Sequence, residues 1–274
     1  LLKQPIPDTD SEGQSLEGLD PSEKVRKQLQ LLFNGRRVLV IADDVWEASQ
    51  ALPLRDIVKL SGSSRMLITA RIRSVIDSLG AAPLRIGLLQ GDAALQLMGS
   101  WARKDDGQPW TIADVQGSAD AMRVAAACGV GAGKAGGMPL ALRAVGSQAS
   151  DLGWDVVYDG LTNTGDAGEL DPAYHPLEEQ YRALFGALRV SLTALSDGMC
   201  ERYVMLAIFL EDERIPLDVL GRLWQLPDMQ ARRLGAELNR RSLVIEGGAR
   251  AGYVRLHDLQ RELLQQEAGA RAAG

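Results

Sequence analysis

Two adjacent carboxylates, Asp43 and Asp44, are the residues of this sequence whose placement most directly suggests chemistry. They follow residues 38–42, a continuous apolar run rich in β-branched side chains that predicts a buried strand. Carboxylate oxygens are hard ligands of the kind that Mg²⁺ uses when it bridges the phosphates of a nucleotide. One carboxylate of such a pair holds the metal, directly or through water, and the other polarises an attacking water. An ordinary acidic turn at the end of a strand is the alternative interpretation.

Arg71 and His257 are candidate phosphate ligands, and each follows a predicted strand or hairpin. A guanidinium after a neighbouring strand can contact the γ-phosphate and so detect whether that phosphate is present. An imidazole can donate a hydrogen bond to a phosphate oxygen and thereby fasten a domain onto a diphosphate. The plain alternatives are a surface arginine and a partly buried structural histidine. The other histidine, His175, lies in a predicted linker without such a context.

A glycine-rich segment, residues 129–137, contains five glycines and one Gly-Lys pair that resembles part of a phosphate-binding loop. Such a loop also requires glycine five positions before the glycine of that pair, and serine or threonine after the lysine. Cys128 and Ala135 occupy those two positions, so we assign no phosphate role to Lys134. Pro139 follows and begins an apolar run, for which a helix with proline in its first turn is the simplest interpretation.

The elements that must position these residues begin with a helix predicted over residues 21–33, which has an acidic start and helical spacing of its apolar side chains. Continuous apolarity predicts strands over 38–42 and 65–69, each buried on both faces as in a parallel sheet, and a third strand near 84–86. Helices between the strands make this the pattern of a doubly wound α/β domain. Ligands of such sheets bind at the carboxyl ends of the strands, where the aspartates and Arg71 lie.

Four segments are expected along the chain. They are a partial α/β domain over residues 1–88, a helical domain over 89–158, a linker rich in glycine and aspartate over 159–176, and a last domain over 177–274. The last domain combines helices with a β-hairpin predicted from two short strands, 243–245 and 253–256, on either side of a Gly-Gly turn. Helices followed by a hairpin favour a winged-helix domain.

The composition is that of an ordinary globular protein, with 46% hydrophobic and 24% charged residues. A net charge of -6 without a basic block argues against a nucleic-acid partner. Two isolated cysteines, Cys128 and Cys200, have the spacing of neither a disulfide framework nor a metal motif, so we expect a reducing, cytoplasmic location. No signal segment is visible, and no apolar run approaches the roughly 18 residues of a membrane helix. Because the chain does not begin with methionine, we expect it to be a piece of a longer protein.

Five motifs along the chain are similar, in the same order, to motifs of NB-ARC proteins. Residues 38–46, VLVIADDVW, resemble the kinase 2 motif LLVLDDVW, and residues 63–71, SSRMLITAR, resemble the motif GSRILVTTR. Residues 137–142, GMPLAL, resemble GLPLAL; residues 203–216 resemble the segment that contains LAVFPED; and residues 256–258, LHD, resemble the MHD motif. Over nearly its whole length, the chain therefore resembles the NB-ARC module of plant disease-resistance and animal apoptotic ATPases of the STAND type.

This resemblance implies a fold and a set of site residues. The implied fold is a partial P-loop NTPase-type α/β parallel sheet, followed by a small helical domain and a winged-helix domain. The implied cofactors are ADP or ATP with Mg²⁺. Asp43 would serve the metal, Asp44 would be the catalytic acidic residue, and Arg71 would sense the γ-phosphate. Pro139 would pack near the adenine base, and His257 would contact the β-phosphate of ADP.

The resemblance also implies a function, namely a signalling switch that is closed with ADP and oligomerises with ATP, in defence or cell-death signalling. The longer protein would be a slow regulatory ATPase, with an effector domain upstream and a repeat sensor downstream. Its Walker A loop would precede Leu1, so the chain by itself is expected not to hydrolyse ATP. Ala70, Met138 and Leu256 are mild departures from the family motifs, and the glycines of residues 129–136 lengthen the approach to Pro139.

Two other functions remain open at this point. One is a winged-helix transcription regulator, because Arg232, Arg233, Arg240 and Arg241 lie near the predicted hairpin and could contact DNA phosphates. A solvated helix face is the simpler interpretation of these arginines. The other is a degenerate scaffold that has lost its phosphate loop and only binds partners.

Overall fold

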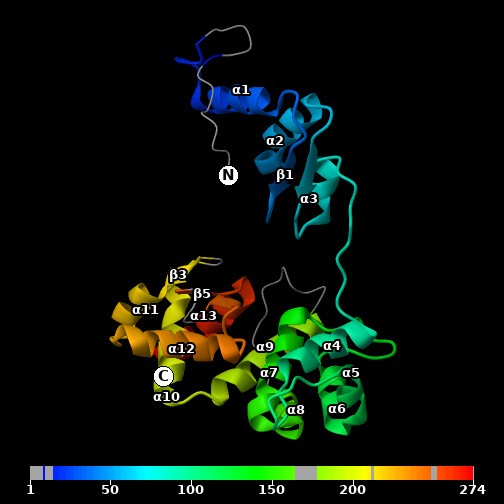
Figure 1. The fold of residues 1–274 in the computed structure, drawn as a ribbon, viewed down its shortest axis with the longest axis vertical. Helices are drawn as coiled ribbons and strands as arrows, with labels where there is room; N and C mark the ends of the chain where they lie inside the picture. The colour runs from blue at the N-terminus through cyan, green and yellow to red at the C-terminus, as the bar shows by residue number, and fades with distance from the viewer. Residues whose placement is uncertain (1–8, 10–14, 164–177, 211–212, 248–251, 274) are drawn as a thin grey trace. The chain divides into compact units, whose positions relative to one another are not determined.

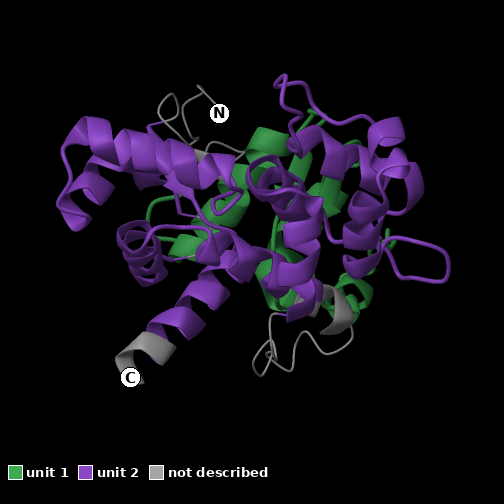
Figure 2. Cartoon of the chain, turned by 90° about the horizontal axis from the view of Figure 1, so that it is seen from below, with its two compact units in different colours: residues 1–86 green, residues 87–274 purple. Residues whose placement is uncertain are grey.

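Our computed structural model describes residues 9, 15–163, 178–210, 213–247 and 252–273 of the chain. It divides into two compact units, Leu1–Ile86 and Gly87–Gly274, which Figure 2 distinguishes by colour. Each unit is described by itself below. No helix in the described residues combines the length and the apolarity that crossing a bilayer requires.

The first unit alternates helices with strands, as the sequence predicts (Figure 1). Its elements are α1 (Pro21–Phe33), β1 (Leu39–Ala42), α2 (Ala48–Leu60), β2 (Arg65–Ile68) and α3 (Arg73–Ser78). Helix α1 begins where predicted, because the side chain of Asp20 accepts a hydrogen bond from the backbone of Ser22 and Pro21 occupies the first turn.

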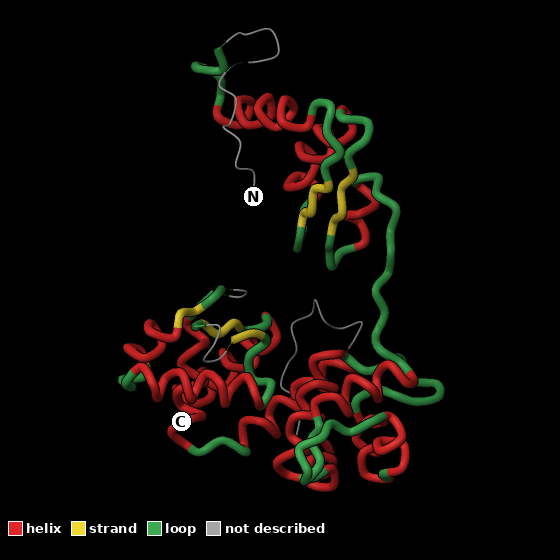
Figure 3. The backbone as a smooth tube through the Cα atoms, viewed as in Figure 1, coloured by secondary structure: helices red, strands yellow, loops and turns green. Residues whose placement is uncertain are grey.

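Strands β1 and β2 pair in parallel, with Leu39 opposite Arg65 and Ala42 opposite Ile68 (Figure 3). The pairing continues beyond the strands, since Thr69 donates its N–H to the carbonyl of Ala42 at 3.0 Å. Both strands therefore end at the same edge of the sheet, and the residues that follow them are neighbours. The predicted parallel α/β arrangement is confirmed for these two strands.

Only one face of this sheet is covered among the described residues. Val40 and Met66 point to the face that packs against α1 and α2. On the opposite face, Leu39, Ile41 and Leu67 remain 61%, 62% and 53% exposed. The prediction of burial on both faces is wrong for the described chain, because successive side chains of a strand alternate between two faces and a second covering layer is missing here.

The predicted third strand near residues 84–86 does not form. Leu84 and Ile86 are each 84% exposed, and the segment makes no ladder in the described part of the chain. A strand requires a partner that supplies backbone hydrogen bonds, and β1 and β2 are described as pairing only with each other. Apolar residues of the right type are therefore not sufficient for a strand at this position.

The second unit begins with helices that pack closely. They are α4 (Gly91–Trp101), α5 (Ile112–Gly117), α6 (Ala119–Ala127), α7 (Pro139–Leu152) and α8 (Trp154–Asn163). Helix α7 crosses α4 at Gly146, where a Cβ atom would collide with the carbonyl of Met98. Helix α8 extends into the predicted linker over residues 159–176, whose remainder, with His175, lies outside the described residues.

The rest of the second unit contains more helices and a small antiparallel sheet. These elements are α9 (Glu178–Thr193), α10 (Asp197–Val204), the 3₁₀ helix η2 (Met205–Ile208), β3 (Ile215–Pro216), α11 (Leu217–Leu223), α12 (Asp228–Arg240), β4 (Glu246–Gly247), β5 (Tyr253–Arg255) and α13 (Asp258–Ala273). The strand order is β3-β5-β4. A hairpin forms as predicted, but its first strand starts later than 243–245, because the backbone N–H of Leu243 still bonds to the carbonyl of Leu238 at the end of α12.

One continuous hydrophobic core runs through the second unit. It extends from Leu95 on α4 through Leu142 on α7 and Phe185 on α9 to Leu238 on α12 and Leu263 on α13. The helical part and the part with the small sheet are therefore stabilised together. The predicted domain boundaries at 88, 158 and 176 stay predictions.

Candidate functional site

Polar side chains meet where β1 and β2 end. Asp43 and Asp44 follow β1, and Thr69 and Arg71 follow β2. Because the two strands are parallel and in register, all four residues lie at one edge of the sheet. This is the edge at which α/β proteins bind their ligands.

The hydroxyl group of Thr69 connects the two aspartates. It donates a hydrogen bond to the carboxylate of Asp43 and accepts one from the backbone N–H of Asp44 at 2.8 Å. Asp44 has a φ of 52°, in the left-handed region that residues other than glycine seldom adopt. The bond to Thr69 therefore helps to hold Asp44 in a backbone conformation that turns it away from the strand direction.

Both carboxylate oxygens of Asp44 have partners within the site. The indole N–H of Trp46 donates to Oδ2 at 3.0 Å, and Nε of Arg71 lies 3.5 Å from Oδ1. The Arg71 guanidinium carbon also lies 5.0 Å from the centre of the Trp46 ring, within range of a cation–π interaction. The Asp44 and Arg71 side chains are 46% and 42% exposed, so solvent screens this ion pair and it is weak.

This donor set suits a magnesium ion that is held together with phosphates. The described residues contain no group of three or more histidine, cysteine or acidic side chains that could hold a metal by themselves. Mg²⁺ commonly takes one or two carboxylates and completes its shell with water and phosphate oxygens. Asp43 and Asp44 fit that requirement and do not fit a cage built from protein ligands alone.

Pro139 lies within the second unit, at the start of α7. It is exposed and is the first residue of α7. Gly137, two residues earlier, forms a two-bond bridge to Leu89, with N···O distances of 3.0 and 2.8 Å. Gly136 has a φ of 109°, and a Cβ atom there would come within 2.8 Å of the Leu89 carbonyl oxygen, so the close approach needs glycine. The glycine segment thus anchors the start of α7 to the incoming chain.

His257 lies at the start of α13, and one of its two ring nitrogens has local contacts. Nδ1 faces the carboxylate of Asp258 and is 3.2 Å from the backbone N–H of Leu259. The backbone N–H of His257 donates to Gln260 Oε1 at 3.0 Å. Among the hydrogen bonds of the described residues, none uses Nε2, and the side chain is 40% exposed.

The residues of this site lie within a segment that matches a known protein family. Residues 6–107 match the model of the NB-ARC domain, and this range includes Asp43, Asp44, Thr69 and Arg71. These residues form an NB-ARC domain. The match ends before Pro139 and His257, so the roles of those two residues stay predictions.

Two curated relatives match the chain over a longer range than the NB-ARC domain. The chain is 26% identical, over 275 residues, to the disease resistance protein RGA2 of Solanum bulbocastanum. It is 24% identical, over 276 residues, to the putative disease resistance protein RGA1 of the same plant. Both alignments cover 92% of the chain but only 26% and 25% of the relatives, so the chain spans about a quarter of their length.

The edge of the sheet where β1 and β2 end contains two residues for which the sequence predicts no role, namely Trp46 and Thr69. Both are inside the recognised motifs, but the motifs alone do not say what these side chains contact. For Thr69, the strand register could have indicated the contact. A hydroxyl one residue past β2 lies beside Asp43, the first residue past β1. The contact of Trp46 with Asp44 and Arg71 depends on side-chain rotamers and has no comparable signal.

Lys134 has a structural role outside the NB-ARC match. Its ammonium group donates a hydrogen bond to the carbonyl of Ala126, near the end of α6. A cation at this position satisfies one of the carbonyls that a helix leaves unpaired at its carboxyl end.

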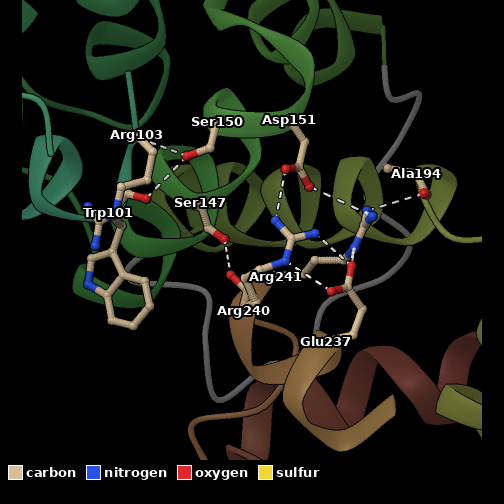
Figure 4. Close-up of polar contacts among 9 residues, drawn as sticks. All are labelled: Trp101, Arg103, Ser147, Ser150, Asp151, Ala194, Glu237, Arg240 and Arg241. Atoms are coloured by element: carbon tan, nitrogen blue, oxygen red, sulfur yellow. Dashed lines mark hydrogen bonds and ion pairs between the residues drawn. The ribbon is translucent and has the colours of Figure 1, made fainter. Parts of the chain in front are cut away.

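Three of the four arginines considered for DNA binding form ion pairs within the protein, and Figure 4 shows two of them, Arg240 and Arg241. Arg240 lies 2.8 Å from Asp151 on α7, and Arg241 lies 2.6 Å from Glu237 on its own helix. Hydrogen bonds from Arg240, and with them those from Arg241, lower the pKa of Glu237 to about 2. Arg232 pairs with Asp228 at 2.9 Å. The acidic partners of these three arginines offset part of the positive charge that a DNA-binding face would need.

Proposed function

We propose that this chain is part of a nucleotide-controlled signalling switch that is closed with ADP and self-associates with ATP. The observation that carries the proposal is the convergence of Asp43, Asp44 and Arg71 at the carboxyl edge of a parallel sheet within an NB-ARC domain. The names of the two relatives support a role in plant-type defence signalling. We place the switch in the cytoplasm, with effector and repeat sensor domains in the longer protein as its partners.

The proposed roles follow from the chemistry of each side chain. Asp43 holds Mg²⁺, with its carboxylate oriented by the hydroxyl of Thr69. When bound, the ion neutralises charge on the nucleotide phosphates. Asp44 polarises the attacking water through a carboxylate that faces solvent, and Arg71 contacts the γ-phosphate with its in-plane N–H groups.

The second unit contributes the contacts that distinguish ADP from ATP in this proposal. Pro139 packs near the adenine base, which its exposed position at the start of α7 supports. His257 donates from Nε2 to the β-phosphate, because its Nδ1 is occupied by local contacts. Nucleotide exchange then biases a two-state hinge through contacts that exist in one state only.

We also propose that further polypeptide completes the nucleotide-binding domain. The exposed face formed by Leu39, Ile41 and Leu67 supports this, because burying large apolar side chains of this kind contributes about 1.5–3 kcal/mol each. The same polypeptide supplies the phosphate-binding loop. Slow, regulatory ATP hydrolysis is therefore a property of the longer protein, and the chain by itself is inactive.

A winged-helix domain is our proposal for the part of the second unit around the small sheet. The order α10, β3, α11, α12, β4, β5 supports it, because helices precede a hairpin that closes the sheet. The alternative of a DNA-binding regulator is weakened by the ion pairs of Arg232, Arg240 and Arg241. We therefore expect this domain to contact nucleotide and protein.

The decisive experiment identifies the nucleotide that the full-length protein retains. The protein is purified, denatured, and its released nucleotide is separated by chromatography, alongside the variants His257→Ala and His175→Ala. We expect stoichiometric ADP in the unchanged protein and in the His175→Ala control. We expect less ADP, or ATP in its place, in the His257→Ala variant. The absence of nucleotide from every sample would instead support the non-hydrolysing scaffold.

A further inference from the structure

The contacts of Trp46 point to a role that the recognised motifs do not assign. We propose that Trp46 is a positioning residue that couples the catalytic carboxylate of Asp44 to the phosphate-sensing guanidinium of Arg71, an inference that rests on the proposed function. Its indole N–H orients Asp44, and its ring face holds Arg71. Arg71 signals the arrival of a triphosphate by leaving Asp44 while it remains over the ring.

The indole N–H determines which carboxylate oxygen remains for Arg71. Tryptophan is a donor only, so the 3.0 Å contact to Oδ2 fixes the carboxylate without adding a charge. Oδ1 then faces Nε of Arg71 at 3.5 Å. Without the indole donor, the carboxylate of Asp44 would be free to rotate, because its other side-chain contact among the described residues is this long ion pair.

The ring face and the carboxylate hold different parts of the guanidinium. A cation–π contact uses the flat face of the group, whereas its N–H donors lie in the plane and point outward. The contact with the Trp46 ring, at 5.0 Å, therefore does not itself use those donors. The contact with Asp44 uses one of those donors and so competes with the phosphate. A phosphate with several charged oxygens is the stronger partner, since the pair with Asp44 is solvent-exposed.

The backbone that carries the indole is held by contacts within the first unit, and Trp46 itself is 45% exposed. The backbone N–H groups of Trp46 and Glu47 both donate to Oε1 of Gln50, at 2.9 and 3.1 Å. This arrangement fixes the chain at the beginning of α2. Val45, the preceding residue, is buried in the core of the first unit. The backbone of Trp46 is thus held from both sides.

Two substitutions separate the two contacts of Trp46. Trp46→Phe keeps an aromatic face and removes the N–H donor, whereas Trp46→Leu removes both. In the full-length protein with Mg²⁺, equilibrium binding of ADP and of a non-hydrolysable ATP analogue is measured together with kcat for ATP. Trp110→Phe, the same substitution in the second unit, is the control. Thermal unfolding midpoints establish that each variant is folded.

We expect Trp46→Phe to lower kcat several-fold while the ratio of ATP-analogue to ADP affinity stays at the unchanged protein's value. We expect Trp46→Leu to lower kcat as well. It should also weaken the binding of the ATP analogue about two- to five-fold without weakening the binding of ADP, because an exposed cation–π contact contributes about that much. In an Arg71→Ala background, Trp46→Leu should have no further effect on that ratio. An Arg73→Ala background, in which a neighbouring arginine is removed, should retain the effect.

Three results would overturn the inference, and they differ in what they leave standing. If both Trp46 variants match an unchanged protein that binds and hydrolyses ATP, Trp46 has no positioning role and the switch still stands. If Trp46→Leu weakens the binding of ADP and of the ATP analogue equally, Trp46 has only a structural role. If the unchanged protein binds neither nucleotide, the proposed function fails and the inference fails with it.

Discussion

The hydroxyl of Thr69 is the smallest group on which the geometry of the acidic pair depends. It bonds to the carboxylate of Asp43 and to the backbone of Asp44 at once. We expect Thr69→Val, which has the same shape but no hydroxyl, to weaken Mg²⁺-dependent nucleotide binding about three- to ten-fold. This is the effect expected when a partly exposed hydrogen bond to a charged group is lost. Titration of Mg²⁺ into the full-length protein with ATP measures this. Thr69→Ser keeps the hydroxyl and should bind like the unchanged protein; equal losses in both variants would contradict the prediction.

The positions of the individual site residues were only partly predictable from the sequence. Asp43, Asp44 and Arg71 could be placed at one edge in advance, because each follows an apolar run and parallel strands end together. The left-handed backbone of Asp44 and its bonds to Trp46 and Thr69 could not. They depend on rotamers and on a hydrogen bond between strands, which apolar periodicity does not encode. The chemical roles of these residues remain predictions.

At the scale of elements, Arg143 joins α7 to the region around the small sheet. Its guanidinium donates to the Ser242 hydroxyl at 3.1 Å and to the carbonyls of Val244 and Ile245, both at 3.2 Å. One face of the group lies over the Trp101 ring at 4.1 Å. Burial lowers the pKa of Arg143, so these neutral acceptors and the ring compensate for lost solvation.

We expect Arg143→Lys to destabilise the protein by about 2 kcal/mol, because a lysine cannot serve several acceptors in one plane or stack on the ring in the same way. Hydrogen exchange of peptides from the end of α12 and from β4 would report the loss locally. The matched control is Arg123→Lys on α6, where the arginine also stacks on a ring, that of Tyr158, but at an exposed position. Similar exchange in both variants would show that Arg143 does not join these elements.

The stability of the carboxyl end of α12 should also depend on pH. Glu237 has a pKa of about 2 in the folded protein, below its ordinary value of 4.5, because Arg240 and Arg241 donate hydrogen bonds to it. The stabilisation is therefore present above about pH 4.5 and is lost as the pH falls toward 2. The urea concentration at the midpoint of unfolding, measured at a series of pH values, should decrease as the pH falls through this window. In the Glu237→Gln variant this decrease should be smaller. A variant at an exposed glutamate of α10, Glu201→Gln, should leave it unchanged.

Elements were predicted where local signals agreed and missed where a partner was needed. Helix α1 has a cap, a proline and helical apolar spacing, and it forms over the predicted residues. The apolar residues 84–86 resemble a strand but have no ladder partner in the described chain. The hairpin begins later than predicted because the backbone of Leu243 is still bonded to Leu238 of α12, a contact that strand propensity does not reveal.

At the scale of the whole molecule, we expect the segment that joins the two units to be readily accessible to proteases. Leu84 and Ile86 are 84% exposed, and residues 81–88 are in neither a helix nor a strand. We expect thermolysin, which cuts before large apolar residues, to cleave before Leu84 or Ile86 early in digestion. Mass spectrometry of timed samples identifies the cut. Early cleavage within α7 with this segment left intact would contradict the two-unit division.

The exposed face of β1 and β2 has a consequence for how this chain behaves when it is produced alone. Leu39, Ile41 and Leu67 form an apolar surface on a sheet whose outer strand edges are unpaired among the described residues. Unpaired edges beside apolar side chains are templates for strand addition between molecules. Solubility would then be limited by copies of the first unit adding to one another, while the second unit, with its continuous core, stays folded. Aggregation of the isolated chain would therefore reveal an incomplete sheet and would not show that the sequence is unable to fold.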